Sequence, residues 1–368
     1  MKIVMIAPKT STFINFRGDL MKAISKKENE IVAICPEGGY EETLKELGAR
    51  CVLVPLKKTS TTILDNLAYL NNLTKIIKQE KPDKIFAYTI KPVIFGSIAA
   101  RRAKVKEMYS MITGLGYVYA VETFKTKILQ LICGIGYKIA FKFNKKVIFQ
   151  NKDDIEEFVN RKYLKREKCE LVDGSGVNME RFKRNDLPEG NTFLMVSRIL
   201  KQKGVREYFE AAKIVKQKYP ETQFLYVGAE DKTQLALNLD EVREEFLTSG
   251  IINYCGESND VPSYIAKCTT FVLPSYYREG VPRTLLEALA MGRPILTTDT
   301  VGCRETVKEG KNGFFVPIKN SQVLAEKMIY MIEHRNELEK MSEESYQYCK
   351  ERFDVDIINK RMLEIMEI

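Results

Sequence analysis

The sequence predicts an α/β protein built from two doubly wound, Rossmann-like domains. Its 368 residues suffice for two domains, and a hydrophobic content of 45% allows each domain a sizeable core. Short apolar runs alternate with longer segments of helical periodicity, which is the pattern of parallel strands joined by crossover helices. The pattern pauses once, between 174 and 190, where Gly, Asn, Asp and Pro form turn-like sequences. We therefore expect one domain on each side of this segment.

In the first half, short apolar runs bounded by charged or turn-forming residues are expected as strands. They are Lys2–Ala7, Ile31–Cys35, Cys51–Pro55, Lys84–Ala87, Met108–Ile112 and Val147–Phe149. The segments between them place apolar residues at helical spacing. Helices are expected at Asn15–Ile24, Thr62–Gln79, Val93–Arg102 and Asp153–Asn160.

The same alternation restarts in the second half. Strands are expected at Thr192–Val196, Gln223–Val227, Ile251–Tyr254, Thr270–Leu273, Ile295–Thr298 and Gly313–Val316. Helices are expected at Gly204–Gln217, Ser321–His334 and Val355–Glu367. These limits give an N-terminal domain of residues 1–173, a C-terminal domain of residues 174–352 and a final helical segment of residues 353–368.

The composition limits the classes of binding partner and the cellular compartment that are expected for the protein. Lys and Arg number 58 against 49 Asp and Glu, a net charge of +9. This mild excess suits a nucleotide diphosphate, a lipid diphosphate or an anionic membrane rather than a nucleic acid, although a merely solvated basic surface is the alternative. The eight cysteines are scattered, as expected for free thiols in a reducing compartment. With no signal peptide and no apolar run near the roughly 20 residues of a membrane span, we expect a cytoplasmic protein.

The most informative stretch runs from Glu279 to Pro294. It reads as a turn, a helix, a Gly-x-Pro stop and an apolar strand, with Glu287 inside the helix. Because Gly280 and Pro282 open that helix, free N–H groups at its N-terminus favour an anion. The two carboxylates would accept hydrogen bonds from sugar hydroxyls. A ligand with a phosphate flanked by hydroxyl-rich groups is a nucleotide sugar, so the stretch indicates a nucleotide-sugar site. The alternative interpretation of the stretch is a surface helix with two solvated glutamates.

This stretch resembles the Glu-x7-Glu signature of glycosyltransferase family 4, a family of retaining enzymes with the GT-B fold. The resemblance implies that Glu279 contacts the donor sugar and that Glu287 contacts the ribose of the nucleotide. It also places the intervening segment against the diphosphate and sugar, at Gly280, Val281, Pro282 and Thr284. Ligands of open α/β sheets bind beyond the carboxyl ends of the strands, which makes the cleft between the two domains the expected site. The resemblance to GT-B enzymes further implies that the last helix returns to the first domain. We expect both features here.

A strand-to-helix connection at 196–204 carries two cations, Arg198 and Lys203. The arginine fork and the lysine point charge suit a diphosphate leaving group. Family 4 members have a similar pair, so the resemblance places both residues on the donor phosphates. A pair of solvated loop cations is the alternative.

The turn at Tyr254–Tyr264 follows an expected strand and resembles the segment that borders the nucleotide base in the family. The candidates there are Gly256, Glu257 and Val261. The same turn also reads as a strand-to-helix loop in which Ser258 or Asn259 caps the helix.

The first domain is expected to bind the acceptor. Asn15 and Arg17 lie at the expected start of the first helix, where they would meet a phosphate or a sugar, although Asn15 also reads as a plain N-cap. Two segments, Tyr88–Pro92 and 112–117, resemble those of family 4 enzymes that extend undecaprenyl-diphosphate-linked sugars. That resemblance places four residues in the catalytic cleft: Lys91, Thr113, Gly114 and Gly116. A plain turn is the alternative for the glycines.

A basic, apolar segment from Phe124 to Lys146 fits a lipid-linked acceptor. Apolar residues recur along it at helical spacing, at Phe124, Ile128, Leu131, Ile135 and Ile139. At about 100° per residue, four lysines cluster beside this stripe: Lys127, Lys138, Lys142 and Lys145. Such a helix would lie on an anionic membrane leaflet. A core-packed helix with a solvated basic edge is the alternative.

Together these features predict a retaining, metal-independent glycosyltransferase that needs no cofactor. It would move a sugar from a UDP-sugar to a polyprenyl-diphosphate-linked sugar at the cytoplasmic membrane face, with Glu279, Arg198 and Lys203 as catalytic residues. The subfamily resemblance alone suggests an N-acetylhexosamine. The sole histidine, His334, lies far along the chain from these motifs. A GT-B nucleotide-sugar epimerase and a non-catalytic binding protein remain alternatives.

Overall fold

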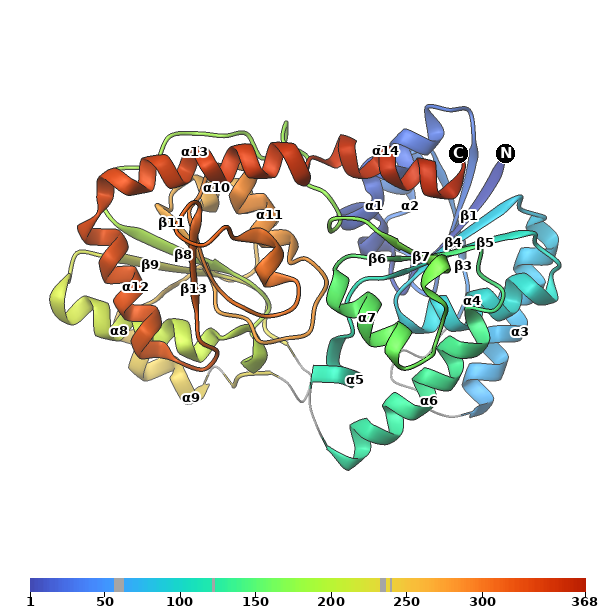
Figure 1. The fold of residues 1–368 in the computed structure, drawn as a ribbon, viewed down its shortest axis with the longest axis horizontal. Helices are drawn as coiled ribbons and strands as arrows, with labels where there is room; N and C mark the ends of the chain where they lie inside the picture. Colours follow the sequence, from blue (N-terminus) through green and yellow to red (C-terminus); the bar gives the residue numbers. More distant parts are fainter. Residues whose placement is uncertain (56–62, 121–122, 232–235, 239) are drawn as a thin grey trace. The chain divides into compact units, whose positions relative to one another are not determined.

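The chain forms two compact α/β units (Figure 1). The computed structural model describes residues 1–55, 63–120, 123–231, 236–238 and 240–368. Unit 1 comprises Met1–Gly176 together with Val355–Ile368, and unit 2 comprises Val177–Asp354. Each unit has its own parallel sheet and its own buried core.

Unit 1 is built on a seven-stranded sheet in the order β3-β2-β1-β4-β5-β6-β7, and each neighbouring pair is parallel. Its strands are β1 (Lys2–Ile6), β2 (Glu30–Cys35), β3 (Ala49–Leu53), β4 (Lys84–Tyr88), β5 (Glu107–Ile112), β6 (Lys146–Phe149) and β7 (Cys169–Leu171). Side chains on both faces of the central strands are buried, because helices cover both sides of the sheet. That explains why these strands read as continuous apolar runs.

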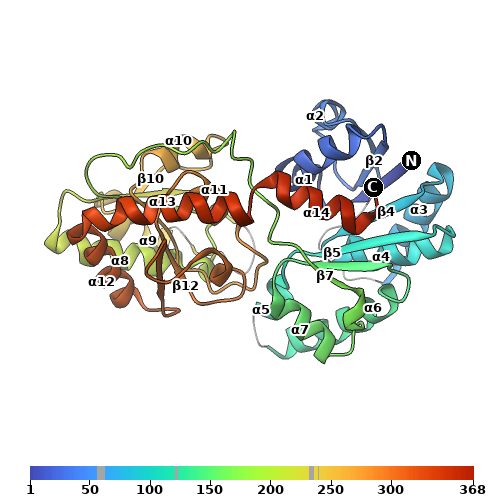
Figure 2. The same ribbon diagram turned by 45° about the horizontal axis from the view of Figure 1, so that its top comes forward.

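The helices of unit 1 are α1 (Thr10–Ser25), α2 (Glu41–Glu46), α3 (Ile63–Glu80), α4 (Ile90–Arg102), α5 (Gly116–Ala120), α6 (Phe124–Ala140), α7 (Lys152–Asn160), the 3-10 turn η1 (Arg166–Lys168) and α14 (Val355–Met366). The helix α14 packs beside α1 (Figure 2). Its last turn is held by Lys84, whose Nζ donates to the carbonyls of Met366 at 2.8 Å and Glu367 at 3.0 Å.

Unit 2 has a six-stranded parallel sheet in the order β10-β9-β8-β11-β12-β13. The strands are β8 (Thr192–Val196), β9 (Gln223–Val227), β10 (Asn253–Tyr254), β11 (Thr270–Leu273), β12 (Ile295–Thr298) and β13 (Gly313–Val316). The helices are α8 (Val205–Lys218), α9 (Asp240–Val242), α10 (Val261–Ala266), α11 (Arg283–Ala290), α12 (Ser321–Glu333) and α13 (Arg335–Arg352), with short helical turns η2 (Lys201–Lys203), η3 (Arg243–Thr248) and η4 (Cys303–Thr306). One hydrophobic cluster joins sheet and helices.

The predicted class of two doubly wound parallel sheets is confirmed, and the differences lie at element ends and in elements that the pattern does not predict, such as β7 and α13. The helix α1 begins at Thr10 rather than at Asn15, because Phe13 already belongs to the buried stripe that continues through Leu20 and Ile24. The helix α6 ends at Ala140 rather than near Lys146, and β7 is a strand that the apolar pattern does not predict.

Candidate functional site

In unit 2 the candidate residues lie on loops that leave the carboxyl ends of parallel strands, where ligands of open α/β sheets bind. Lys203 follows β8 and Glu279 follows β11. The ammonium of Lys203 donates to both carboxylate oxygens of Glu279, with 2.7 Å between Nζ and Oε1. The side chains are only 12% and 17% exposed, respectively. Two residues that the sequence assigns to the donor phosphates and the donor sugar are therefore in direct contact.

Close backbone packing fixes the loops that carry these side chains. A Cβ at Gly204 would lie 2.3 Å from the carbonyl oxygen of Pro274, and one at Gly302 would lie 1.6 Å from that of Gly280. Both glycines have positive φ, at 77° and 83°. The Lys203 loop therefore touches the β11 loop, and the loop after β12 touches the Glu279 turn. These contacts leave no room for a side chain at either position, so both positions require glycine.

Arg198 has a carboxylate partner of its own. Its Nη1 donates to Oδ2 of Asp231 at 2.8 Å, and the arginine side chain is 57% exposed whereas that of Asp231 is buried. The peptide that carries Arg198 is packed against Gly228, where a Cβ would lie 1.7 Å from the carbonyl oxygen of Ser197. The structure therefore places Arg198 on the expected loop, with its guanidinium bound to a residue that the sequence did not single out.

Glu287 lies in the second turn of α11 and is buried, with Nε of Arg283 donating to its Oε1 at 2.9 Å. Burial raises the pKa of the Glu287 carboxyl, and Arg283 followed by Arg181 act in the opposite direction. The residue before the helix, Pro282, offers no side-chain cap to the first N–H groups of α11. Of the remaining candidates in this stretch, Val281 is buried and Thr284 partly buried.

Burial of the Glu287 carboxylate should lower the stability of the fold by an amount that depends on pH. Replacement of Glu287 by glutamine tests this expectation. Because the native pKa is raised, the folded chain binds this proton more tightly than the unfolded chain, so the carboxyl destabilises the fold progressively as pH rises from the unfolded value of about 4.3 through the native value. Glutamine carries no such proton. Thermal melts at several pH values should show Glu287→Gln gaining stability over the wild type as pH rises through that window. A difference in melting temperature that does not change with pH would contradict the assignment.

The turn after β10 is tied to its neighbours through Gly256, whose carbonyl accepts from the N–H of Gly228 at 2.8 Å. Glu257 is exposed, and Val261 is partly accessible. The sequence proposed Ser258 or Asn259 as the cap of the next helix, and this is wrong. The cap of α10 is Asp260, which accepts from the N–H of Ser263, because the helix begins one residue later than expected.

In unit 1 the predictions for Asn15 and Arg17 need correction. Neither residue lies at a helix N-terminus, since Lys9 is the N-cap of α1. Asn15 is exposed, so it is also not the cap. Arg17 is buried, with its guanidinium 5.5 Å from the centre of the Tyr88 ring and its Nη1 donating to the carbonyl of Phe16 at 3.0 Å. Arg17 is thus part of the buried packing around Tyr88.

Lys91, Thr113, Gly114 and Gly116 lie after β4 and β5, which are neighbours in the sheet, and all four are partly accessible. Burial lowers the pKa of the Lys91 ammonium, and Asp65 acts in the opposite direction. Thr89, two residues before Lys91, has φ 70° and ψ 160°, a conformation that is strained for a β-branched residue. Such strain is concentrated at functional sites.

The apolar stripe of α6 does not pack in the core. Phe124, Leu131 and Ile135 are 82%, 65% and 55% exposed, and Ile128 and Ile139 are exposed too. The opposite face supplies Tyr137, whose ring stacks on that of Phe141 and contacts that of Phe158 at a tilt. Lys127 and Lys138 are exposed beside the stripe, whereas Lys142 and Lys145 lie beyond the helix end, so the predicted helical cluster of four lysines is wrong. Lys145 pairs with Glu107 and Glu367.

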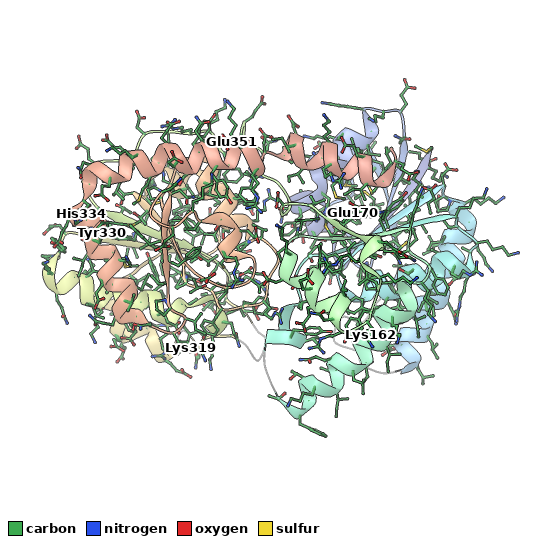
Figure 3. All side chains as sticks on the ribbon, in the orientation of Figure 1. Lys162, Glu170, Lys319, Tyr330, His334 and Glu351 are labelled. Atoms are coloured by element: carbon green, nitrogen blue, oxygen red, sulfur yellow. The ribbon has the colours of Figure 1, made fainter. Side chains whose placement is uncertain are left out.

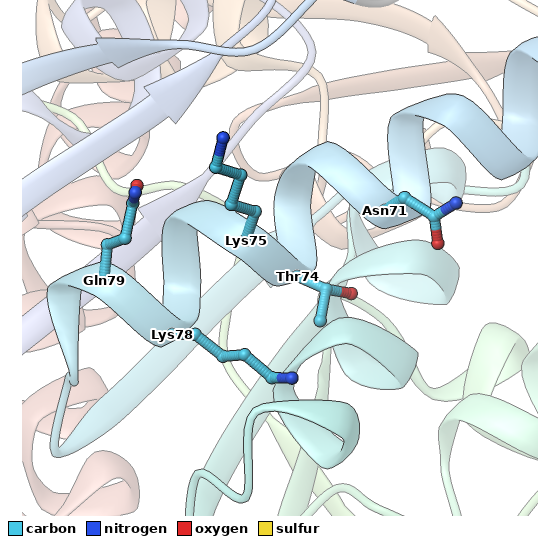
Figure 4. Close-up of a pocket in the computed structure, with 5 residues that line it drawn as sticks. All are labelled: Asn71, Thr74, Lys75, Lys78 and Gln79. Atoms are coloured by element: carbon cyan, nitrogen blue, oxygen red, sulfur yellow. The ribbon is translucent and has the colours of Figure 1, made fainter.

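Other features lie apart from these candidates. A hollow of about 380 Å³ runs along α3, lined by Asn71, Thr74, Lys75, Lys78 and Gln79 (Figure 4). The ring of His334 stacks on that of Tyr330 at the end of α12, with 3.9 Å between ring centres (Figure 3). Among the described residues, no cluster of His, Cys, Asp and Glu is placed to hold a metal ion. Within the same ranges, no helix combines the length and the apolar character needed to cross a membrane.

Two family models together match most of the chain. The model described as glycosyl transferase 4-like matches residues 2–151, and the model described as glycosyl transferases group 1 matches residues 178–348. The chain belongs to the group 1, family-4-like glycosyltransferases. The resemblance seen in the sequence is thereby confirmed.

Two similar glycosyltransferases are named for the reactions they catalyse. N,N'-diacetylbacillosaminyl-diphospho-undecaprenol alpha-1,3-N-acetylgalactosaminyltransferase of Campylobacter jejuni is 29% identical, over 100% of this chain and 98% of its own. UDP-Gal:alpha-D-GlcNAc-diphosphoundecaprenol alpha-1,3-galactosyltransferase of Escherichia coli is 26% identical, over 81% of this chain and 78% of its own.

Solved structures agree on the glycosyltransferase fold. HepE of Anabaena in complex with UDP has a TM-score of 0.79 at 18% identity and covers 100% of both chains. A glycosyltransferase of Rickettsia africae has a TM-score of 0.78 at 19% identity, over 100% of this chain and 97% of its own. The predicted GT-B fold is confirmed.

Gly302 is a residue of this glycosyltransferase that sequence reasoning missed, because its importance lies in a contact between distant loops. Gly302→Ala should lower the rate of sugar transfer about 10- to 100-fold, since a displaced Glu279 turn misplaces a reacting group. Gly310→Ala is the control, because Gly310 has a similar φ of 73° but a Cβ added there would meet nothing within 4 Å. Equal rates for the two variants would show that the contact with Gly280 is not needed.

Proposed function

We propose that this glycosyltransferase is retaining and metal-independent, and that it moves an N-acetylhexosamine from a UDP-sugar to a polyprenyl-diphosphate-linked sugar. The observation that carries the proposal is the contact between Lys203 and Glu279 at the carboxyl edge of the unit 2 sheet. Two relatives support it, since both are named for transfer to a diphospho-undecaprenol-linked sugar. HepE supports the choice of nucleotide, because its structure holds UDP.

In the donor half of the reaction, Arg198 and Lys203 hold the diphosphate and Glu279 positions the donor sugar. The acceptor oxygen attacks the anomeric carbon while the bond from that carbon to the β-phosphate oxygen breaks. The departing phosphate takes the acceptor proton on the face where the new bond forms, and the two cations stabilise the charge that develops on it. Glu287 receives the ribose, and Gly256, Glu257 and Val261 border the base.

In the acceptor half, the edge of unit 1 that carries Lys91, Thr113, Gly114 and Gly116 receives the lipid-linked sugar. The Lys91 side chain is partly accessible at this edge, although burial lowers the pKa of its ammonium. Its charge suits the diphosphate of the acceptor. The strained backbone of Thr89 lies directly before α4, the helix that carries Lys91.

The membrane-facing part of the proposal rests on α6. Its exposed face presents Phe124, Leu131 and Ile135, with Lys127 and Lys138 alongside. An apolar face flanked by lysines matches the acyl and phosphate levels of an anionic leaflet. The enzyme would thus work as a peripheral protein on the inner face of the membrane, where a polyprenyl carrier holds the acceptor.

The double variant Leu131→Gln with Ile135→Gln should weaken binding to vesicles that contain an anionic phospholipid by about tenfold or more, because two apolar side chains no longer enter the bilayer. Cosedimentation with vesicles measures this. Ile357→Gln is the matched control, since Ile357 is also an exposed isoleucine of unit 1 but lies on α14. Equal binding by the double variant and the wild type would remove α6 from the membrane contact.

The enzymatic proposal is tested by release of UDP from a panel of UDP-sugars, with and without a membrane extract that supplies polyprenyl-diphosphate-linked acceptors. Release that needs the extract and occurs with one N-acetylhexosamine donor is the expected result. Interconversion of a UDP-sugar without an acceptor would favour a GT-B epimerase instead. Binding of UDP with no turnover across the panel would favour a non-catalytic binding protein.

A further inference from the structure

The Glu279 carboxylate has a second partner besides Lys203. The hydroxyl of Ser275 donates to its Oε1 at 2.9 Å, and Ser275 is fully buried. The carbonyl of Gln202 lies farther from the same hydroxyl, at 3.3 Å, and a carboxylate is the stronger acceptor. The lysine ammonium is a mobile point charge that attracts the carboxylate without fixing its orientation. A short buried side chain with one donor fixes a single oxygen.

Ser275 is itself held in place from three sides. The N–H of Tyr277 donates to its Oγ at 3.3 Å, which leaves the hydroxyl proton for Glu279. The hydroxyls of Thr298 and Thr300, at the end of β12 and on the loop after it, donate to its carbonyl. The next residue, Tyr276, donates its N–H to the carbonyl of Gln202 at 2.8 Å. The serine therefore connects the loops that follow β8, β11 and β12, and it also contacts the glutamate.

We propose that Ser275 is a positioning residue that fixes the Glu279 carboxylate for the donor sugar, an inference that rests on the proposed role of Glu279. When a diphosphate approaches, it competes with Glu279 for the Lys203 ammonium. The hydrogen bond from Ser275 then keeps Oε1 in place, and Oε2 is presented to a sugar hydroxyl. Ser275 acts only through the carboxylate, so its effect should vanish when the carboxylate is absent.

A double-mutant cycle for UDP release tests this dependence. Ser275→Ala should lower kcat roughly 10- to 100-fold, the size expected for a hydrogen bond to a charged group, with a smaller change in the donor KM. In a Glu279→Ala background, which removes the acceptor of this hydrogen bond, the same substitution should leave kcat unchanged. Ser345→Ala is the matched control, because Ser345 is also a fully buried serine of unit 2, and its hydroxyl bonds to the carbonyl of Arg293 at 3.0 Å.

Melting temperatures separate positioning from loss of fold. Similar melting temperatures for Ser275→Ala and Ser345→Ala, with only the first impaired in kcat, support the proposal. Additive losses in the double variant, or equal kcat for the two serine variants, would overturn it while leaving the glycosyltransferase proposal intact. Absence of transfer by the wild type with every donor and acceptor would overturn the proposed function and this inference together.

Discussion

Replacement of Glu279 by glutamine is expected to lower kcat by two to three orders of magnitude while the chain stays folded. The substitution keeps the shape of the side chain but removes the charge that orients the donor sugar beside the breaking bond, and loss of one preorganised polar group of this kind costs about 100- to 1000-fold. Glutamine keeps one oxygen that accepts a hydrogen bond from the Lys203 ammonium, so the chain is expected to stay folded. Initial rates of UDP release with saturating donor measure the effect.

Glu305 offers a matched control for this substitution. It is an ion-paired glutamate of unit 2 whose side chain is 17% exposed, as is that of Glu279, and its partner is Arg352 rather than Lys203. Glu305→Gln should therefore retain near-native turnover. Near-native turnover in Glu279→Gln would remove that residue from the mechanism, whereas equal losses in both variants would point to damage of the fold.

The features that the sequence predicts well are those that depend on periodicity or on a continuous motif. Buried parallel strands between crossover helices leave apolar runs at regular intervals, so most predicted strands end within two residues of the observed ones. Glu279 and Glu287 belong to one stretch of chain whose turn and helix have a recognisable order. Lys203 lies on another such stretch, and its contact with Glu279 follows once both strands join one sheet.

The features that could not be predicted depend on contacts between loops far apart in the chain. Ser275 acquires its place from Thr298 and Thr300, and Asp231 meets Arg198 across two strand ends. Neither contact leaves a periodic or compositional signal. The lysine cluster of α6 is wrong for a different reason, since a rotation of about 100° per residue applies only as far as the helix, which ends at Ala140.

Replacement of Arg198 by alanine is expected to lower kcat/KM for the donor by about two orders of magnitude, without loss of stability. The guanidinium pairs with Asp231, so a diphosphate must take it from that carboxylate. A phosphate offers the planar fork two oxygens and gains negative charge as the bond to the sugar breaks, which favours the exchange in the transition state. An ion pair this exposed adds little to folding.

Rates of UDP release measured over a range of donor concentrations test this expectation for Arg198→Ala. Two further variants serve as a control and separate the effect of charge from that of bidentate binding. Arg184→Ala is the control, because Arg184 is also a partly exposed, ion-paired arginine of unit 2, bound to Glu343. Arg198→Lys keeps the charge but loses the fork, so recovery of most activity by lysine would show that only the charge is needed. Recovery of little activity would assign the effect to bidentate binding of the leaving phosphate. Native kcat/KM in Arg198→Ala would exclude Arg198 from the donor site and leave Lys203 as the cation that holds the diphosphate.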